Sequence, residues 1–396
     1  MIAIKEKSSH FSYLQCSQCD KMYPAGCVNS YASCELCGKN VLVSVYEHLS
    51  GITPADIDQK DFSMWRYFPV LPVIDRKNIV TLGEGFTPIL PLTKLGAQLD
   101  LKKLILKDES FNPTGSFKAR GMSMAISKAR ELGITKCIVP TAGNAGGAMS
   151  AYCAKAGIEA VVVMPEHTPQ IFKQECENYG ATLILEKGLI NDCARKVIEI
   201  NSDGEYFDVS TLKEPYRLEG KKTLGYEIAE QLEWRLPDVI LYPTGGGTGL
   251  IGMWKAFHEM IDMGWILPDF LPRMIAVQAE NCQPIVKTWS GFQNNCEDYI
   301  GQSTFANGLA VPRPFGEKLI LKVLKESLGT AVAVGEDEIK DSMKEIAKCE
   351  GMLLSPEGAA LWPALKRLVS AKSIGRGETV LMLNTGTGYK YLENLN

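Results

Sequence analysis

Short apolar runs that end in glycine-bearing turns recur through this chain after about residue 82. Several of these runs are continuously apolar, which is expected of parallel strands that are covered on both faces. Segments with a helical pattern, such as 121–133 and 144–157, alternate with them. The runs expected to form strands are 101–109, 136–143, 159–166, 181–186, 238–247 and 378–388. The alternation predicts an α/β fold with parallel sheets, and the length of 396 residues suggests two such units.

The composition excludes several classes of protein. A net charge of −4 without a basic stripe gives no reason to expect a surface for nucleic acid or membrane. No apolar run approaches the roughly 20 residues that cross a bilayer, and the N-terminus lacks the apolar core of a signal peptide. We therefore expect a cytoplasmic protein. Its four histidines lie outside the glycine-rich and cysteine-rich motifs, which argues against a Ser-His-Asp triad or a histidine-bound catalytic metal.

Two Cys-x-x-Cys pairs stand close together near the N-terminus. Cys16 and Cys19 lie in "CSQC", and Cys34 and Cys37 lie in "CELCG". This spacing is typical of a closed, structural four-cysteine zinc site, and reduced thiols without metal are the alternative. The other eight cysteines occur singly, so no disulfide framework is expected. The polar segment 47–73 that follows is expected to be a linker or an arm.

One lysine stands at the predicted start of a helix. Lys118 lies in "SFNPTGSFKARGM", directly after Phe117 and a run of residues that favour a helix start. The positive end of the helix dipole and desolvation by the aromatic ring both disfavour a charged amine there. A neutral amine is what a lysine needs to form a Schiff base with an aldehyde.

Three glycine-bearing turns follow predicted strands, where open α/β sheets bind their ligands. In "PTAGNAGGA", Asn144 could reach a ring oxygen of a ligand, although a turn without any ligand is an even alternative. In "YPTGGGTG", Gly245, Gly246, Gly247 and Thr248 open a helix and predict a phosphate site. This segment lacks the lysine of a Walker loop and the acidic residue of a dinucleotide fingerprint. In "NTGTGYKY", Thr385 could meet a ring nitrogen or cap a helix. Together with Lys118, these motifs describe a site for pyridoxal 5′-phosphate.

With these motifs the chain resembles the tryptophan-synthase-β-like, or fold type II, group of pyridoxal-phosphate enzymes, and within it the threonine synthases. The motifs that carry the resemblance are "LGEGFTPILPL", "NPTGSFK", "AGNAGGA", "YRLEGKKTLGYEI", "PTGGGTG", "LSPEGAALW" and "NTGTGYK". The resemblance implies two open twisted α/β sheet domains with the active site between them, after a zinc-ribbon-like segment. We expect residues 1–45 to form that ribbon, 46–121 with 213–396 the large cofactor-binding domain, and 122–212 the small domain.

The resemblance also implies a role for each site residue. Lys118 would bind the cofactor as a Schiff base beside Phe117, Asn144 would contact its ring hydroxyl, and Thr385 its ring nitrogen. Gly245, Gly246, Gly247 and Thr248 would bind its phosphate. Thr141, Ala142, Gly143 and Asn144 would bind the substrate carboxylate, and Arg217 its phosphate, since a guanidinium fork suits that group. Lys213, Lys221 and Lys222 are alternatives to Arg217, the latter two being expected on a solvated helix face.

The activity that this implies is conversion of O-phosphohomoserine and water to threonine and phosphate, by a chain that could be a homodimer. Three departures from the family pattern touch substrate recognition and none touches the cofactor: Ala119 in "SFKARG", Ala145 in the asparagine loop, and "STLKEPYR" ahead of the arginine. They motivate the alternative of a serine/threonine dehydratase or a related β-replacement lyase. A catalytically silent binding protein, with the ribbon recruiting a partner, is a third hypothesis.

Overall fold

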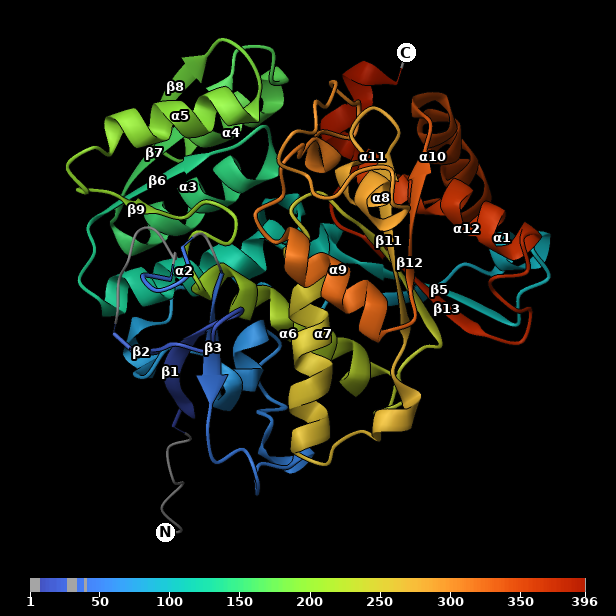
Figure 1. The fold of residues 1–396 in the computed structure, drawn as a ribbon, viewed down its shortest axis with the longest axis horizontal. Coiled ribbons are helices and arrows are strands. Elements are labelled where there is room, and N and C mark those ends of the chain that lie inside the picture. The colour runs from blue at the N-terminus through green and yellow to red at the C-terminus, as the bar shows by residue number, and fades with distance from the viewer. Residues whose placement is uncertain (1–7, 27–33, 39–40, 396) are drawn as a thin grey trace.

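The computed structural model describes residues 8–26, 34–38 and 41–395. Figure 1 shows two parallel sheets with their helices and a small antiparallel sheet near the N-terminus. None of the helices in the described residues is both long and apolar enough to span a membrane.

A six-stranded sheet forms the larger unit, in the order β12-β11-β10-β13-β5-β4. Its strands are β4 (Ile89–Pro91), β5 (Lys103–Asp108), β10 (Val239–Pro243), β11 (Arg273–Ala279), β12 (Thr330–Val334) and β13 (Thr379–Asn384). The strands are parallel except for β4, which runs antiparallel to β5 at the edge. Every residue of β10 is buried, which explains the continuously apolar sequence of its first four residues.

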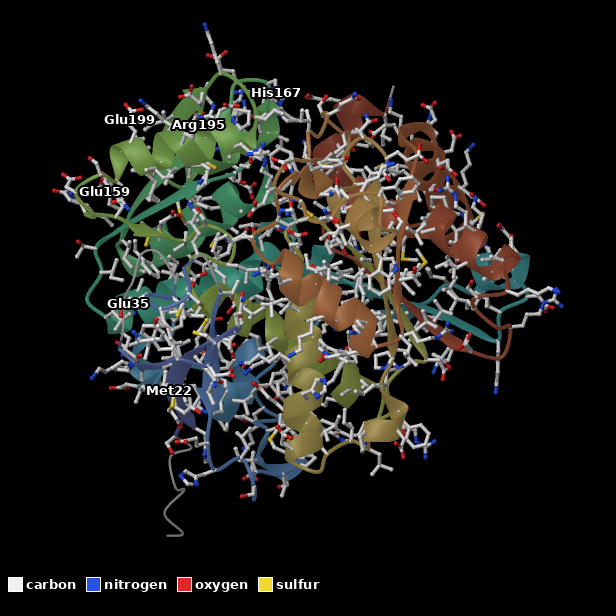
Figure 2. All side chains as sticks on the ribbon, in the orientation of Figure 1. Met22, Glu35, Glu159, His167, Arg195 and Glu199 are labelled. Carbon is white, nitrogen blue, oxygen red and sulfur yellow. The ribbon has the colours of Figure 1, made fainter. Side chains whose placement is uncertain are left out.

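A four-stranded parallel sheet forms the second unit, in the order β8-β7-β6-β9. Its strands are β6 (Lys136–Pro140), β7 (Glu159–Pro165), β8 (Thr182–Glu186) and β9 (Phe207–Asp208), with helices α3 (Asn144–Ala156), α4 (Gln170–Asn178) and α5 (Ile190–Ile200). In Figure 2 the labelled side chains of Glu159, Arg195 and Glu199 lie on the outer surface of this unit.

The expected strands and their parallel arrangement are confirmed, and four further strands of these two sheets, β4, β9, β11 and β12, were not among them. The four-stranded sheet is drawn from residues 136–208, whereas the six-stranded sheet is drawn from 89–108 and 239–384. The exact domain boundaries given above stay a prediction.

Helix α6 (Tyr216–Gln231) packs against both α2 (Lys118–Glu131) and α7 (Thr248–Asp262) beside the six-stranded sheet (Figure 1). Glycines permit the close approach: a Cβ atom on Gly220 of α6 would lie 2.1 Å from the carbonyl oxygen of Arg120 on α2. On the other side of α6, a Cβ atom on Gly252 of α7 would lie 3.0 Å from the amide nitrogen of Lys222. The remaining helices are α1 (Thr93–Gln98), α8 (Pro284–Trp289), α9 (Glu317–Glu326), α10 (Glu336–Glu350), α11 (Pro356–Ala359) and α12 (Leu361–Ser370).

The N-terminal sheet consists of β1 (Phe11–Cys16), β2 (Met22–Pro24) and β3 (Leu42–Tyr46), with β1 in the middle. It is tied to α6, because the Tyr46 hydroxyl donates a hydrogen bond of 2.7 Å to Glu219. The expectation of a linker over 47–73 is wrong for its second half, since every residue of the 3₁₀ helix Met64–Val70 is buried. The indole of Trp65 donates hydrogen bonds to Glu84 and Ser123, both at 3.0 Å.

A buried network of charges joins β5, α2 and α6. The guanidinium of Arg120 bonds Glu109 at 2.6 Å and Glu227 at 2.8 Å, and Lys107 bonds Glu227 at 2.5 Å. All four side chains are fully buried. The two cations hold the pKa of Glu227 at about 2, against the opposing effect of burial. Because Arg120 lies two residues after Lys118, this network fixes the first turn of α2.

We predict that Arg120→Met strongly destabilises the protein, because it leaves two buried carboxylates with fewer partners. Removing one member of such a buried pair costs about 3–5 kcal/mol in the free energy of unfolding. Thermal and urea unfolding measure the change. The control is Arg195→Met, because Arg195 is exposed and its partner Asp192 lies one turn earlier in the same helix, α5. Similar unfolding midpoints for the two variants would contradict a structural role for the network.

Candidate functional site

A pocket of about 290 Å³ lies between the two parallel sheets. Its wall is formed by the residues that follow β6, β10 and β13 and by the N-terminal turns of α2, α3, α6 and α7. All of the residues predicted for the cofactor and the substrate line it: Phe117, Lys118, Thr141, Ala142, Gly143, Asn144, Arg217, Gly245, Gly246, Gly247, Thr248 and Thr385. The topology thus brings five segments that are distant in sequence to one site.

Lys118 is the first residue of α2, as the sequence predicts. Its Nζ lies 4.1 Å from the centroid of the Phe117 ring. Within the described part of the chain this amine makes no hydrogen bond or ion pair, although the pocket makes it partly accessible. Burial deep in the protein and the nearby charge of Arg217 lower the pKa of Lys118 to about 8, with Glu357 opposing them. The amine is therefore available as a neutral nucleophile near physiological pH.

The backbone around Lys118 is tied to the C-terminal strand of the sheet. The Phe117 amide donates a hydrogen bond of 3.0 Å to the carbonyl of Thr385, directly after β13. The side chain of Asn384 bonds Asp108, at the end of β5, at 2.8 Å. These bonds place the Thr385 side chain and the Lys118 amine in one pocket.

The triple-glycine turn between β10 and α7 leaves room for an anion. Gly247 has a φ of +73°, and a Cβ atom there would lie 2.4 Å from the Ile320 side chain. A Cβ atom on Gly245 would lie 2.2 Å from the carbonyl oxygen of Gly308. Across the described residues, the amides of 245–248 find no hydrogen-bond acceptor. Open amides at a helix N-terminus form a site for a phosphate group.

Asn144 begins α3 and faces the same pocket. Its Oδ1 accepts a hydrogen bond of 3.1 Å from Lys390, which also binds Glu175 at 2.7 Å and the Thr114 carbonyl at 2.8 Å. The bond from Lys390 fixes which side of the Asn144 amide carries the oxygen. The amide nitrogen therefore points the other way, where it can donate to the Tyr391 hydroxyl or to a ligand in the pocket.

Arg217 lies in the first turn of α6 and is buried. Its Nη1 donates to the carbonyl of Val209, and its Nε has no partner among the described residues. Burial lowers the pKa of this guanidinium, and the carboxylates of Glu214 and Asp208 oppose that shift. The position gives the pocket a positive charge near Ser210 and Lys118.

The structure corrects the expected solvated positions of two lysines. Lys221 and Lys222 are both buried on α6. Lys222 faces away from the pocket and pairs with Glu219 and Glu259 at 2.7 and 2.9 Å. Lys221 lines the pocket, as does the half-buried Lys213, which lies 3.4 Å from Asp208.

Sequence reasoning missed several residues of the pocket. Glu357, at the start of α11, accepts hydrogen bonds from the Gly308 amide at 2.7 Å and the Tyr391 hydroxyl at 3.1 Å. A signal was present, because Glu357 lies in "LSPEGAALW" and Tyr391 directly follows "NTGTGYK", two motifs that carried the resemblance. The missed lining residues with polar side chains are Asn191, Ser210, Thr211, Asn307, Arg313, Glu357 and Tyr391.

The four histidines lie away from the pocket lining. Figure 2 labels His167 on the surface of the four-stranded unit. The cysteines near the N-terminus gather separately: the sulfurs of Cys16, Cys19, Cys34 and Cys37 all lie within 4.8 Å of one another. Four thiols at this separation fit the donor set of a tetrahedral zinc site.

Comparison with known proteins agrees with this geometry. The profile of one protein family, described as "Pyridoxal-phosphate dependent enzyme", matches residues 80–386. The chain is 32% identical over 378 residues to a threonine synthase of Methanocaldococcus jannaschii, covering 95% of this chain and 92% of that protein. It is 34% identical to a threonine synthase of Methanosarcina acetivorans, covering 94% and 91%.

Solved structures share the fold. Serine racemase from Dictyostelium discoideum superposes with a TM-score of 0.62 at 23% identity, covering 76% of this chain and 92% of that one. The processed form of threonine deaminase isoform 2 from Solanum lycopersicum gives a TM-score of 0.64 at 21% identity, covering 78% and 87%. Pyridoxal phosphate, the cofactor in the description of the matching family, carries an aldehyde and a phosphate. The desolvated amine of Lys118 and the open amides of 245–248 fit those two groups.

We predict that the rate of Lys118 acylation reaches half of its maximum near pH 8, because half of the amine is then neutral. An ordinary lysine reaches that point at about pH 10.4. Cofactor-free protein is treated with an acylating reagent across a pH series, and the rate of Lys118 labelling is measured by mass spectrometry. In Arg217→Met the midpoint should move upward, since a neighbouring cation that disfavours the charged amine is gone. An unchanged or lower midpoint would show that Arg217 does not act on Lys118.

Proposed function

We propose, from the premise that this chain belongs to the pyridoxal-phosphate dependent enzyme family, that it is a threonine synthase. It converts O-phosphohomoserine and water to threonine and inorganic phosphate. One observation carries this proposal: the similarity to proteins named threonine synthase extends over more than nine-tenths of both chains. The pocket supports it, because Lys118, the glycine turn and Arg217 line one cavity.

In this proposal residues from both units hold the cofactor. Lys118 binds its aldehyde carbon, and the amides of 245–248 with the Thr248 hydroxyl bind its phosphate. Asn144 donates to its ring oxygen, Thr385 meets its ring nitrogen, and Phe117 packs beside it. The bound cofactor supplies an electron sink for negative charge that develops on the substrate carbons.

Substrate recognition is assigned to the two sides of the pocket. The turn from Thr141 to Asn144 opens α3 and binds the substrate carboxylate, as the positive end of a helix favours. Arg217 binds the substrate phosphate through its guanidinium fork. This arrangement places the γ carbon that carries the phosphate toward α6 and the α carbon toward Lys118.

Lys118 moves the protons of the reaction. The Lys118 amine lines the pocket, and its pKa of about 8 would let it exchange a proton with bound substrate close to neutral pH. In its neutral form it can accept a proton at one carbon and return it at another. The C–O bond to phosphate at the γ carbon breaks, and water adds at the β carbon. Atoms balance as phosphohomoserine plus water giving threonine plus phosphate.

We further propose that Cys16, Cys19, Cys34 and Cys37 bind one structural zinc ion and that the enzyme acts in the cytoplasm. The eleven cysteines that the structure describes are free thiols, which supports a reducing compartment. A homodimer stays a prediction, which light scattering on the pure protein tests.

We predict that the purified protein releases phosphate and threonine in equal amounts from O-phosphohomoserine. Coupled phosphate detection and amino-acid analysis measure the two products. Lys118→Ala should abolish turnover without unfolding the protein. Formation of an oxoacid from threonine or serine, with no phosphate released from O-phosphohomoserine, would instead establish the dehydratase alternative that Ala145 motivates.

The same assay separates the role of Arg217. Arg217→Lys keeps the charge and removes the fork, so kcat/KM for O-phosphohomoserine should fall about 10- to 100-fold. The slower reaction of an unphosphorylated analogue should change much less. Equal losses for both substrates would make Arg217 a structural residue.

We predict one zinc ion per chain in the metal analysis of the pure protein. Cys16→Ser should lose this ion and lower the melting temperature, because metal binding contributes folding free energy. The kcat of the folded fraction should stay unchanged, since the cysteines lie outside the pocket lining. A zinc-free protein with an undiminished melting temperature would contradict a structural metal.

A further inference from the structure

Lys221 is a buried cation for which the reaction above has no use. Its side chain on α6 is 1% exposed, and its Nζ donates a hydrogen bond of 2.6 Å to the hydroxyl of Thr248. The same Nζ lies 4.7 Å from the centroid of the Phe117 ring. Thr248 is the first residue of α7 and the last of the glycine turn. Lys221 therefore reaches the phosphate site, although it lies far from that turn in sequence.

Helix packing explains how this lysine reaches the turn. A Cβ atom on Gly252 would lie 3.2 Å from the Lys222 Cα atom, so α6 and α7 cross closely one helical turn after Thr248. On the α2 side, a Cβ atom on Gly121 would lie 3.1 Å from the Cε atom of Lys221. Glycine at position 121 thus leaves space for the aliphatic stem of the lysine.

The surroundings of Lys221 are positive. Burial and the charges of Arg217 and Lys118 lower the pKa of this amine, and the opposing effect of Glu214 is smaller. The Glu214 carboxylate already accepts hydrogen bonds from the amides of Tyr216 at 2.6 Å and Arg217 at 3.1 Å. No carboxylate in the described residues forms an ion pair with Lys221. These effects disfavour the charged form of the Lys221 amine, and an anionic ligand beside it would favour that form.

The adjacent Lys222 is a buried lysine that does have carboxylate partners. It is equally buried and adjacent in sequence, yet two glutamates form ion pairs with it. The difference between these neighbours lies in the direction they face, and Lys221 faces the open amides of the glycine turn.

We propose that Lys221 is the counter-ion for the terminal phosphate of the bound cofactor, acting together with Thr248 and the amides of 245–248. The dianion of that phosphate supplies the negative charge that the protein lacks at this point. The inference rests on the cofactor assignment of the proposed function and not on the reaction or its substrate.

The test compares two ligands that differ only in the phosphate. Full-length protein is stripped of cofactor and titrated with pyridoxal 5′-phosphate or with pyridoxal, and the visible absorbance of the Lys118-bound ligand reports binding. In Lys221→Met the Kd for pyridoxal 5′-phosphate should rise at least about tenfold, because a charge-assisted bond to phosphate is lost. The Kd for pyridoxal should stay within about twofold. Equal weakening of both ligands, or of neither, would overturn the proposal.

Two further variants serve as controls. Lys221→Arg keeps the charge and should retain part of the preference for the phosphorylated ligand. Lys213→Met removes another lysine of the same pocket, whose partner is Asp208, and should leave the ratio of the two Kd values unchanged. If Lys213→Met loses as much of the preference for the phosphorylated ligand as Lys221→Met does, the effect is one of general pocket charge, and a specific contact of Lys221 is overturned.

Folding is checked separately. The melting temperature of cofactor-free Lys221→Met should equal or exceed that of the wild type, because a buried amine is replaced by a thioether of similar length. If this variant does not fold, Lys221→Gln carries the same comparison of ligands, since it keeps a donor and removes the charge. The outcomes also separate the two proposals. If Lys221→Met changes the Kd ratio but the wild type does not turn over O-phosphohomoserine, the Lys221 contact is supported and the proposed activity is refuted. If the wild type turns over O-phosphohomoserine but the Kd ratio does not change, the activity is supported and the Lys221 contact is refuted.

Discussion

The bonds of Arg120 to Glu109 and Glu227 are the constraint on which the site depends. They join the end of β5, the first turn of α2 and the middle of α6, and they do so without access to water. Because a guanidinium fork satisfies two carboxylates in fixed directions, the first turn of α2 has little freedom. Lys118 begins that turn, and its amine is consequently presented to the pocket rather than to solvent. Ala119, directly before Arg120, is buried and takes no part in these ion pairs.

Helix α6 connects the site to the N-terminal sheet. One face carries Arg217 and Lys221 toward the pocket, and another carries Glu219 and Lys222 toward β3 and α7. The ring of Tyr46 lies 3.9 Å from the Lys222 amine, so the ribbon covers a cluster of buried charges instead of a solvated helix. The described strands of the N-terminal sheet contribute no residue to the pocket lining. Through Tyr46 the sheet nevertheless shields from water the ion pairs of Glu219 and Lys222 that hold α6 in place.

Local sequence was sufficient for some parts of the site and insufficient for others. Lys118 and residues 245–248 could be found because a strand, a glycine turn and a helix start are consecutive in the chain. The same logic placed Lys221 and Lys222 in solvent, because a helix with many charged residues is usually exposed. Their partners, Thr248 and Glu259, lie on another helix, α7, and the sequence around the two lysines does not predict these contacts. The segment 64–70 was likewise misjudged, since its polar flanks obscured a buried aromatic core.

The distribution of charge in the pocket has a further consequence for product release. Lys118, Arg217 and Lys221 repel one another in a desolvated space, and each proposed anion relieves that repulsion. A pocket in which every cation faced the substrate phosphate would also hold the phosphate that the reaction releases. Lys221 is instead bonded to Thr248 at the start of α7, whereas Arg217 lies beside Val209 and Ser210 at the start of α6. On this division, one cation stays with a permanent ligand and one exchanges its anion in every turnover. In the proposed function, Arg217 would bind the exchanging phosphate with a guanidinium whose Nη1 is already bonded to the Val209 carbonyl, which leaves fewer of its donors for the anion.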